Sequence, residues 1–486
     1  MKKLVVWICV LSLLTGVLSG CNKATETGAE SGKIHLRFSF WEPSTGKEME
    51  TALRKIEESY EKMHPEVDIE LVSQPASGYQ DWIKTQMSVD DLPEIECNYA
   101  PNLISQANVG SVVSIKEALE SKNPYNNDII WKDSFIDGLL DGAHEYRVSP
   151  EYNIPLFQTG IAMFYNKTVY EELGLEVPKT WNEFIENCKA IEKADKIPNA
   201  FMGQKKDAIR WLSRELMGGV CLEKWLADKN LNLNGDSYLS KNEVVKAIDS
   251  GAYNISNNKS YQEDFERYLE FVKEYAKYSP NASGLDEASA KTLFLSGKAV
   301  HLNSGSWDIV GLLKNDEIDF EPGVFRFPLL TKENSEYAGK GMSNNAAQTL
   351  AITSSVEKQE GAKEAAVDFL MYLTAPDQYA NFVNETYQIP SVKDVKVDPI
   401  FNEFIEDGYP LVILFNVGDS AAGRTFEDAF SQVAFGNDIT LDDALYSEIQ
   451  KSLEAWCKKY MDTNKLSAEN DYDLANMPFI GEAFIK

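Results

Sequence analysis

Histidine is scarce in this 486-residue chain, which has only four, at positions 35, 64, 144 and 301. The motifs G-x-S-x-G, H-E-x-x-H and G-x-x-x-x-G-K-[ST], which mark common hydrolases and phosphate-binding enzymes, are absent. The 76 acidic residues guarantee apparent carboxylate pairs, so such pairs carry no information about glycoside hydrolysis. We therefore expect no enzyme, and a glycoside hydrolase is the least favoured alternative.

Cysteine is also rare, and the six cysteines are widely scattered, at positions 9, 21, 97, 188, 221 and 457. No C-x-x-C pair or zinc spacing is present, so free buried thiols are expected, with one disulfide left open. The stretch 230–241 resembles a calcium loop. However, Lys241 stands at the twelfth position, where a bidentate carboxylate is needed. We expect no metal and no cofactor.

Positive charge and long apolar runs are the remaining deficits. The formal net charge is −29, which disfavours nucleic acid and anionic lipid headgroups as partners of the folded body. A solvated acidic surface accounts for this charge, and an acidic pocket for a cationic ligand is the minority reading. The first apolar run, residues 4–17, is too short to span a hydrocarbon core of about 30 Å as a helix, and no later segment is longer.

The N-terminus has the pattern of a secretion signal followed by an acylation motif. Lys2 and Lys3 precede the apolar run, as in secretory signals, and Leu18-Ser19-Gly20-Cys21 resembles the lipobox of bacterial lipoproteins. The resemblance implies cleavage after residue 20 and a diacylglyceryl group on Cys21, and two acyl chains anchor a protein stably. Residues 21–33 are polar or small and are expected to form a flexible tether. The predicted location is the extracytoplasmic face of a bacterial cell membrane.

The rest of the chain alternates strand and helix patterns. Residues 34–40 and 67–71 alternate apolar and polar side chains, and the apolar residues of 49–63 recur at helical spacing, which predicts a βαβ unit with parallel strands. From about 178 to 295 the pattern is mostly helical. Thr180 with Glu183, and Ser240 with Glu243, have the spacing of capping boxes. These patterns predict an α/β protein.

Four segments, which occur along the chain in the same order as in the family, resemble the family 1 extracellular solute-binding proteins of ABC importers. They are "YNIPLFQTGIAMFYNKTVYEELGLEVPKTWNEF" (152–184), "FLSGKAVHLNSGSW" (294–307), "AITSSVEKQEGAKEAAVDFLMYLTAPDQ" (351–378) and "LPEIECNYAPNLISQANVGSVVSI" (92–115). The resemblance implies a two-lobed periplasmic-binding-protein-like fold, each lobe a mostly parallel sheet flanked by helices, with a hinge between the lobes. It also implies a monomer that passes its ligand to the permease subunits of an ABC transporter.

The lobe boundaries follow from the same resemblance. The N-terminal lobe is predicted to comprise 34–153 and 328–387, and the C-terminal lobe 154–327 and 388–486. The chain would cross between the lobes near residues 153–154, 325–328 and 387–390. A ligand is expected between the lobes, beyond the carboxyl ends of the parallel strands.

Ten residues are predicted to meet a sugar, whose apolar C–H faces and hydroxyl edges suit aromatic rings, carboxylates and amides. They are Trp41, Glu42, Trp82, Asn98, Tyr99, Gln158, Trp211, Trp307, Asn345 and Arg424. The prediction rests chiefly on Trp307, since family members often stack a sugar ring at this place. For Arg424 the alternative role is a surface salt bridge, and for the other residues it is core packing. Trp181 is left out because the family uses that tryptophan for packing.

The ligand class is less defined than the fold. Aromatic residues near the expected site favour a carbohydrate, in particular an oligosaccharide. The family also contains polyamine binders, and the acidity of the chain leaves that alternative open. A ligand sensor that feeds a signalling partner uses the same fold and is a further alternative.

Overall fold

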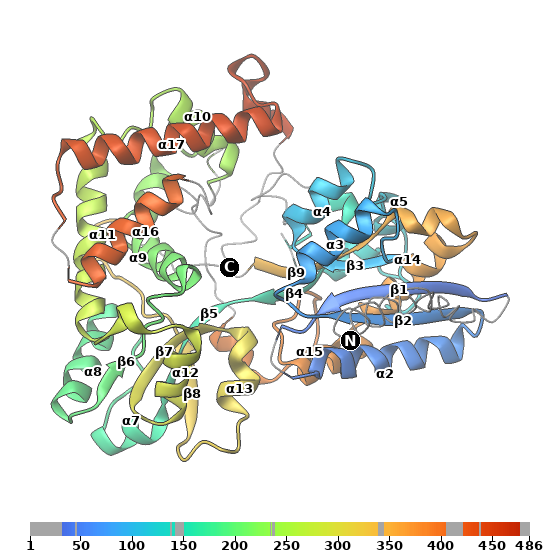
Figure 1. The fold of residues 1–486 in the computed structure, drawn as a ribbon, viewed down its shortest axis with the longest axis horizontal. Coiled ribbons are helices and arrows are strands. Elements are labelled where there is room, and N and C mark those ends of the chain that lie inside the picture. The colour runs from blue at the N-terminus through green and yellow to red at the C-terminus, as the bar shows by residue number, and fades with distance from the viewer. Residues whose placement is uncertain are drawn as a thin grey trace, which may run out of the picture.

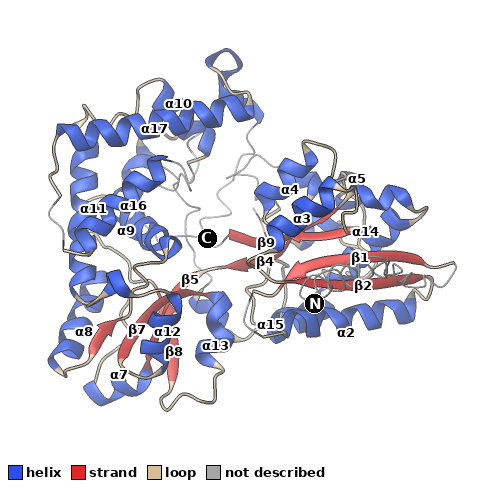
Figure 2. Ribbon diagram, viewed as in Figure 1, coloured by secondary structure: helices blue, strands red, loops and turns tan. Residues whose placement is uncertain are grey.

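The computed structural model describes residues 32–43, 46–136, 139–140, 150–233, 235, 239–338, 345–404, 421–436 and 439–476. These residues form two α/β lobes, each built on its own sheet (Figures 1 and 2). The five-stranded sheet has the order β2-β1-β3-β9-β4, and the four-stranded sheet the order β6-β7-β5-β8. The predicted two-lobed α/β fold is confirmed.

The first lobe contains the five-stranded sheet and the helices around it. Its elements are β1 (Ile34–Trp41), α2 (Glu48–Met63), β2 (Val67–Gln74), α3 (Tyr79–Ser88), β3 (Ile95–Asn98), α4 (Ala100–Ala107), α5 (Lys116–Leu119), β4 (Ile154–Thr159), β9 (Asn345–Ile352), α14 (Ala362–Leu373) and α15 (Pro376–Thr386). Strand β1 pairs in parallel with both β2 and β3, whereas β9 runs antiparallel to β3 and β4. The parallel β1-α2-β2 unit agrees with the sequence prediction.

The alternation along β1 decides what each face of this sheet contacts. Leu36, Phe38 and Phe40 are buried in one core with residues of α2, α14 and α15. On the opposite face Ser39 bonds to Tyr79 of α3, with 2.8 Å between the two hydroxyl oxygens. Helices therefore cover both faces near the carboxyl end of β1, and this leaves the strand end to form a site.

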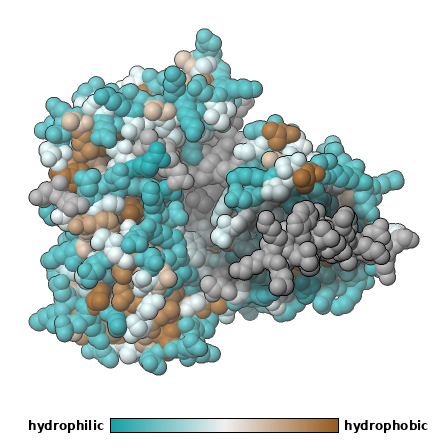
Figure 3. All heavy atoms as spheres, in the orientation of Figure 1, coloured by the Kyte–Doolittle hydropathy of each residue, from teal (hydrophilic) through white to brown (hydrophobic). Residues whose placement is uncertain are grey.

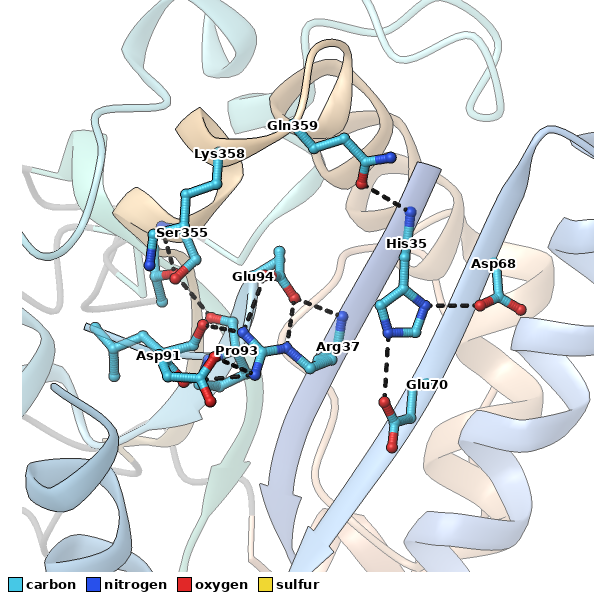
Figure 4. A network of polar contacts seen from close by, with 12 residues as sticks. His35, Arg37, Asp68, Glu70, Asp91, Pro93, Glu94, Ser355, Lys358 and Gln359 are labelled. Carbon is cyan, nitrogen blue, oxygen red and sulfur yellow. Dashed lines mark hydrogen bonds and ion pairs between the residues drawn. The ribbon is translucent and has the colours of Figure 1, made fainter. Parts of the chain in front are cut away.

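Near its amino end, β1 is tied to the loop before β3 by Arg37 (Figure 4). The guanidinium donates from Nε to Glu94 Oε2 and from Nη2 to Glu94 Oε1, each at 3.1 Å. It also donates from Nη1 to Asp91 Oδ1 at 2.9 Å and from Nη2 to the Leu92 carbonyl at 2.6 Å. This fork of charged hydrogen bonds helps to fix β3 beside β1. His35, also on β1, has its ring between Asp68 and Glu70 of the neighbouring strand β2.

The second lobe contains the four-stranded sheet and a larger set of helices. Its elements are β5 (Ile161–Asn166), α7 (Lys167–Leu173), α8 (Trp181–Lys193), β6 (Ile197–Asn199), α9 (Lys206–Ala227), α10 (Lys241–Asp249), α11 (Lys259–Lys277), α12 (Glu287–Leu295), β7 (Ala299–Gly305), α13 (Ile309–Leu313), β8 (Pro322–Arg326), α16 (Ala421–Ala434) and α17 (Asp443–Asn464). Strands β6 and β7 are parallel, and β5 runs antiparallel to β7 and β8.

Both predicted capping boxes are present. The Thr180 side chain accepts from the Glu183 backbone N–H while the Glu183 carboxylate accepts from the Thr180 N–H, and Ser240 and Glu243 make the same exchange. Trp181 is buried in the hydrophobic core of the second lobe, the second core, as expected for a packing residue. Local sequence alone therefore positions the starts of α8 and α10.

Strand pairing and core packing shift the first two crossings between the lobes relative to the prediction. Strand β4 pairs with β9 in the first sheet, so the first crossing comes at residue 160, where β4 ends and β5 begins, and not at 153–154. Leu330 and Ala338 pack in the second core, so the second crossing lies beyond 338 and not at 325–328.

The residues around the third predicted crossing, 387–390, contact both lobes. Val392 packs in the first core, and the Lys393 N–H donates to the Ser134 carbonyl of the first lobe at 2.8 Å. Phe401 and Phe404 then pack in the second core. Ile389 also packs in the second core, so residues 387–401 contact both lobes and the crossing at 387–390 stays a prediction. With these shifts, the division of the chain into two lobes stays a proposal in its details.

The surface is mostly hydrophilic on both lobes in the view of Figure 3, which fits the interpretation of the negative charge as a solvated surface. Cys97, Cys188, Cys221 and Cys457 are free and buried, as expected. Within the described ranges, no helix combines the length and apolar character that crossing a membrane requires. Cys21 and the tether to residue 31 lie outside the described residues.

Candidate ligand-binding site between the lobes

The first-lobe part of the site lies at the carboxyl ends of β1 and β3. Because these strands are parallel, their last residues, Trp41 and Asn98, lie at the same edge of the sheet. Helices α3 and α4 begin shortly after this edge. Polar and aromatic side chains from two strands and two helices are therefore gathered in one place.

Four aromatic residues form the first-lobe cluster: Trp41, Tyr79, Trp82 and Tyr99. The Trp41 ring centroid lies 4.8 Å from that of Tyr79 and 5.1 Å from that of Tyr99, and Tyr79 lies 5.9 Å from Trp82. Trp41 is only 6% exposed, whereas Tyr99 is 49% exposed. Tyr99 thus presents the open ring of the cluster, and Trp41 supports it from behind.

Asn98 lies below this aromatic layer and is fully buried. Its Oδ1 accepts from Gln80 Nε2 at 2.8 Å, from the Tyr99 N–H at 2.8 Å and from Asn102 Nδ2 at 2.9 Å. Its Nδ2 donates to Glu96 Oε1 at 2.6 Å. Both ends of the amide are engaged inside the lobe, so Asn98 orients its neighbours and does not itself face solvent, contrary to the predicted ligand contact.

Two other predicted residues also have structural partners. The Glu42 carboxylate accepts from the backbone N–H groups of Met49 and Glu50, at the start of α2. Burial raises its pKa, and these hydrogen bonds act in the opposite direction. The buried Gln158 side chain donates from Nε2 to the Pro390 carbonyl at 2.5 Å, and its backbone N–H donates to Ile389. Glu42 therefore caps a helix, and Gln158 holds β4 to the segment around the third predicted crossing.

The second-lobe part consists of Trp307, Trp211 and Lys205. Trp307 follows the carboxyl end of β7 in a 3-10 turn, Ser306–Asp308, and its ring centroid lies 5.1 Å from that of Trp211 on α9. The Lys205 ammonium lies 5.0 Å from the Trp211 centroid and 6.0 Å from that of Trp307. A Cβ added at Gly305 would lie 2.2 Å from the Trp307 ring, so only glycine lets the indole lie this close to the strand.

A chain of ion pairs holds these residues in place. Lys205 Nζ lies 2.6 Å from Glu287 Oε2, and Lys291 Nζ lies 2.8 Å from Glu287 Oε1 and 2.7 Å from Asp308 Oδ1. Ser304 Oγ lies 2.5 Å from the other Asp308 oxygen. Since two lysines face two carboxylates, the charges around the indoles compensate each other.

The Asp207 carboxylate of the second lobe acts electrostatically on Tyr99 of the first lobe. Burial raises the pKa of Tyr99, and the negative charge of the Asp207 carboxylate raises it further. Asp207 opens α9 and pairs with Arg210, which also donates to Glu427. The aromatic cluster of one lobe therefore faces the start of the helix that carries Trp211.

Lys205 and Asp207 were missed by the sequence analysis. Both residues follow β6, whose carboxyl end lies beside that of β7. Polar residues directly after a parallel strand were the sequence signal that could have identified them as site residues. The backbone of Asn345 opens β9 opposite Thr159, and its side chain is outside the described residues. Arg424 lies exposed near the start of α16. The geometry thus brings Trp41, Trp82 and Tyr99 together in one lobe, and Trp211 and Trp307 in the other.

Comparison with known proteins identifies the class. The family model described as bacterial extracellular solute-binding protein matches residues 42–380. The multiple sugar-binding protein of Streptococcus mutans is 24% identical over 393 residues, 80% of this chain and 84% of the relative. The melibiose/raffinose/stachyose-binding protein MelE of Bacillus subtilis is 23% identical over 205 residues, 42% of this chain and 44% of the relative.

Solved structures agree on the fold. A chitin oligosaccharide binding protein superposes with a TM-score of 0.62 at 17% identity, covering 88% of this chain and 99% of that one. RafE in complex with raffinose gives 0.59 at 18% identity, covering 87% and 100%. The fold is that of a two-lobed binding protein. The chain belongs to the bacterial extracellular solute-binding proteins, whose place is outside the cytoplasm.

Proposed function

We propose that this protein captures an oligosaccharide between its lobes and delivers it to the permease subunits of an ABC transporter. The observation that carries the proposal is the pair of aromatic surfaces on opposite lobes, Tyr99 on one and Trp211 with Trp307 on the other. Rings on both sides suit the two apolar faces of a sugar, and hydroxyl edges then meet polar side chains.

The charges beside the tryptophans favour a neutral ligand over a polyamine. The Lys205 ammonium already lies over both indoles, so a cationic ligand would have to displace it. The carboxylates nearby, Glu287 and Asp308, are already paired with lysines. A polyamine site needs aromatic faces and carboxylates that are free of other cations, whereas here Lys205 lies over the indoles and lysines already pair with Glu287 and Asp308.

The names of the relatives support the ligand class. The Streptococcus mutans relative is named for several sugars and the Bacillus subtilis relative for melibiose, raffinose and stachyose. One of the similar structures contains stachyose. We extend this class to the present chain, and we further propose that it acts as a monomer without catalysis. A diacylglyceryl group on Cys21 would anchor it at the extracytoplasmic face of the membrane.

A thermal-shift screen tests the proposal. Raffinose, stachyose and chitin oligosaccharides are the sugar probes, and spermidine represents the polyamine alternative. A ligand at a hundred times its dissociation constant adds about 2.7 kcal/mol to the free energy of unfolding, which a melting curve resolves easily. We expect one of the sugars to stabilise the protein and to be recovered intact. Stabilisation by spermidine alone would contradict the proposal, and sugar fragments after incubation would favour the hydrolase.

A further inference from the structure

Two buried side chains beneath Tyr99 leave a matching pair of acceptor atoms unpaired. Glu96 on β3 is fully buried, and Gln106 on α4 is almost so. Gln106 Nε2 donates to Glu96 Oε1 at 2.8 Å. The other atom of each group, Glu96 Oε2 and Gln106 Oε1, has no hydrogen-bond partner among the described residues. Two buried acceptors without donors are costly, so this arrangement calls for a donor.

A single proton on Glu96 Oε2, donated to Gln106 Oε1, would satisfy both atoms. We infer that Glu96 is protonated on Oε2 in the folded protein, that it pairs with Gln106 as a cyclic acid–amide dimer, and that this dimer positions Tyr99 through Asn98. In such a dimer the acid O–H donates to the amide oxygen while the amide N–H donates to the acid carbonyl. The second of these bonds is already present.

The connection to Tyr99 runs through a continuous set of hydrogen bonds. Glu96 Oε1 accepts from Asn98 Nδ2 at 2.6 Å, which fixes the orientation of the Asn98 amide. The Asn98 oxygen then holds the Tyr99 N–H, together with Asn102 of α4 and Gln80 of α3. Glu96 is thus a positioning residue for the ring that, under the proposed function, meets the sugar. Its protonation itself does not depend on that function.

No cation faces Glu96 from the described elements packed against it. The titratable groups near it are Tyr79 on α3 and Cys97 on β3, and burial raises the pKa of both well above their usual values. Ser39 on β1 bonds to Tyr79, and Ala351 on β9 pairs with Glu96 through the backbone. Burial raises the pKa of Glu96 to about 7. Ionisation above that pH would place an unpaired charge beneath Tyr99 and weaken the dimer.

The test compares two glutamates of similar acidity but different position. Burial also raises the pKa of Glu57 to about 7, and Glu57 lies on α2, which packs on the other face of the sheet. In Glu96→Gln, the new amide N–H replaces the acid O–H as donor to Gln106, without a titration. Glu57→Gln removes an equivalent titration and leaves the Gln106 dimer intact, so it is the matched control.

The readout is the NMR signal of the Tyr99 ring in the ligand-free protein between about pH 5.5 and 8.5. The signal is assigned by its loss in Tyr99→Phe. We expect it to shift with a midpoint near pH 7 in the wild type and in Glu57→Gln, and to stay constant in Glu96→Gln. A Tyr99 signal that does not titrate in the wild type would overturn the inference without any variant. A Glu96→Gln protein that fails to fold, or whose Tyr99 signal still titrates, would also overturn it. Because no sugar is used, failure here is distinct from failure of the proposed function.

Discussion

Replacing Arg37 by Met should strongly destabilise the first lobe. The Arg37 side chain is 24% exposed and that of its partner Glu94 is 12% exposed. The substitution keeps the hydrogen bond from the backbone N–H of residue 37 to Glu94 Oε2. It removes the guanidinium hydrogen bonds to the Glu94 and Asp91 carboxylates and to the Leu92 carbonyl (Figure 4). Breaking a fully buried pair costs about 3–5 kcal/mol, and partial exposure lowers this to about 2–3 kcal/mol.

Chemical denaturation measures this cost, and two further variants separate its causes. Lys55→Met breaks an exposed ion pair, in which the side chains of Lys55 and Glu385 are 61% and 38% exposed. This variant should lose less than about 1 kcal/mol of stability. Adding Glu94→Gln to Arg37→Met removes the stranded carboxylate and should recover part of the loss. If Arg37→Met lies within about 0.5 kcal/mol of the wild type, the network does not hold β3 to β1 as we argue.

Three further predictions concern the helix starts, the anchor and the lobes. Ser240→Ala should lower the free energy of unfolding by up to about 2 kcal/mol, and Thr180→Ala by about 1 kcal/mol. The difference is expected because the Ser240 cap is buried and the Thr180 cap is more exposed. A larger loss for Thr180→Ala than for Ser240→Ala would contradict this. Cys21→Ser should release the protein from membranes or leave it unprocessed, and mass spectrometry that finds an unmodified Cys21 on the mature membrane-bound form would refute the anchor. A bound sugar should bring the lobes together without forming an oligomer, so small-angle scattering should show compaction at saturation, and its absence would count against closure.

Local features were predictable because they depend on neighbouring residues. The capping boxes at Thr180 and Ser240 need only a spacing of three, and the burial of Phe38 follows from alternation along one strand. The crossings were not predictable in the same way. That β4 belongs to the first sheet depends on its pairing with β9, almost two hundred residues later in the chain. Nothing within residues 150–160 carries that information.

The site shows the same division between local and distant information. The sequence located the strand ends at Trp41, Asn98 and Trp307, because polar and aromatic residues follow strand patterns there. It did not show which of them stays exposed, since Tyr99 covers Trp41 and α3 with α4 encloses Asn98. Lys205 reaches the indoles only because β6 lies beside β7. Exposure and reach depend on packing between elements, and no single segment encodes them.

Trp307 offers the sharpest test of the site, since it is partly exposed and rests against Gly305 and Trp211 outside the second core cluster. Trp307→Ala should therefore weaken sugar binding by roughly 10²-fold while costing less stability than truncating a core aromatic, for which about 3–5 kcal/mol is typical. Trp181→Phe is the opposite control. Trp181 is buried and donates from Nε1 to Glu274 at 2.6 Å, so its replacement should lower stability and leave affinity near normal. Calorimetric titration and denaturation of both variants decide the matter. A Trp307→Ala protein that loses stability as a core variant does, yet binds sugar normally, would remove Trp307 from the site.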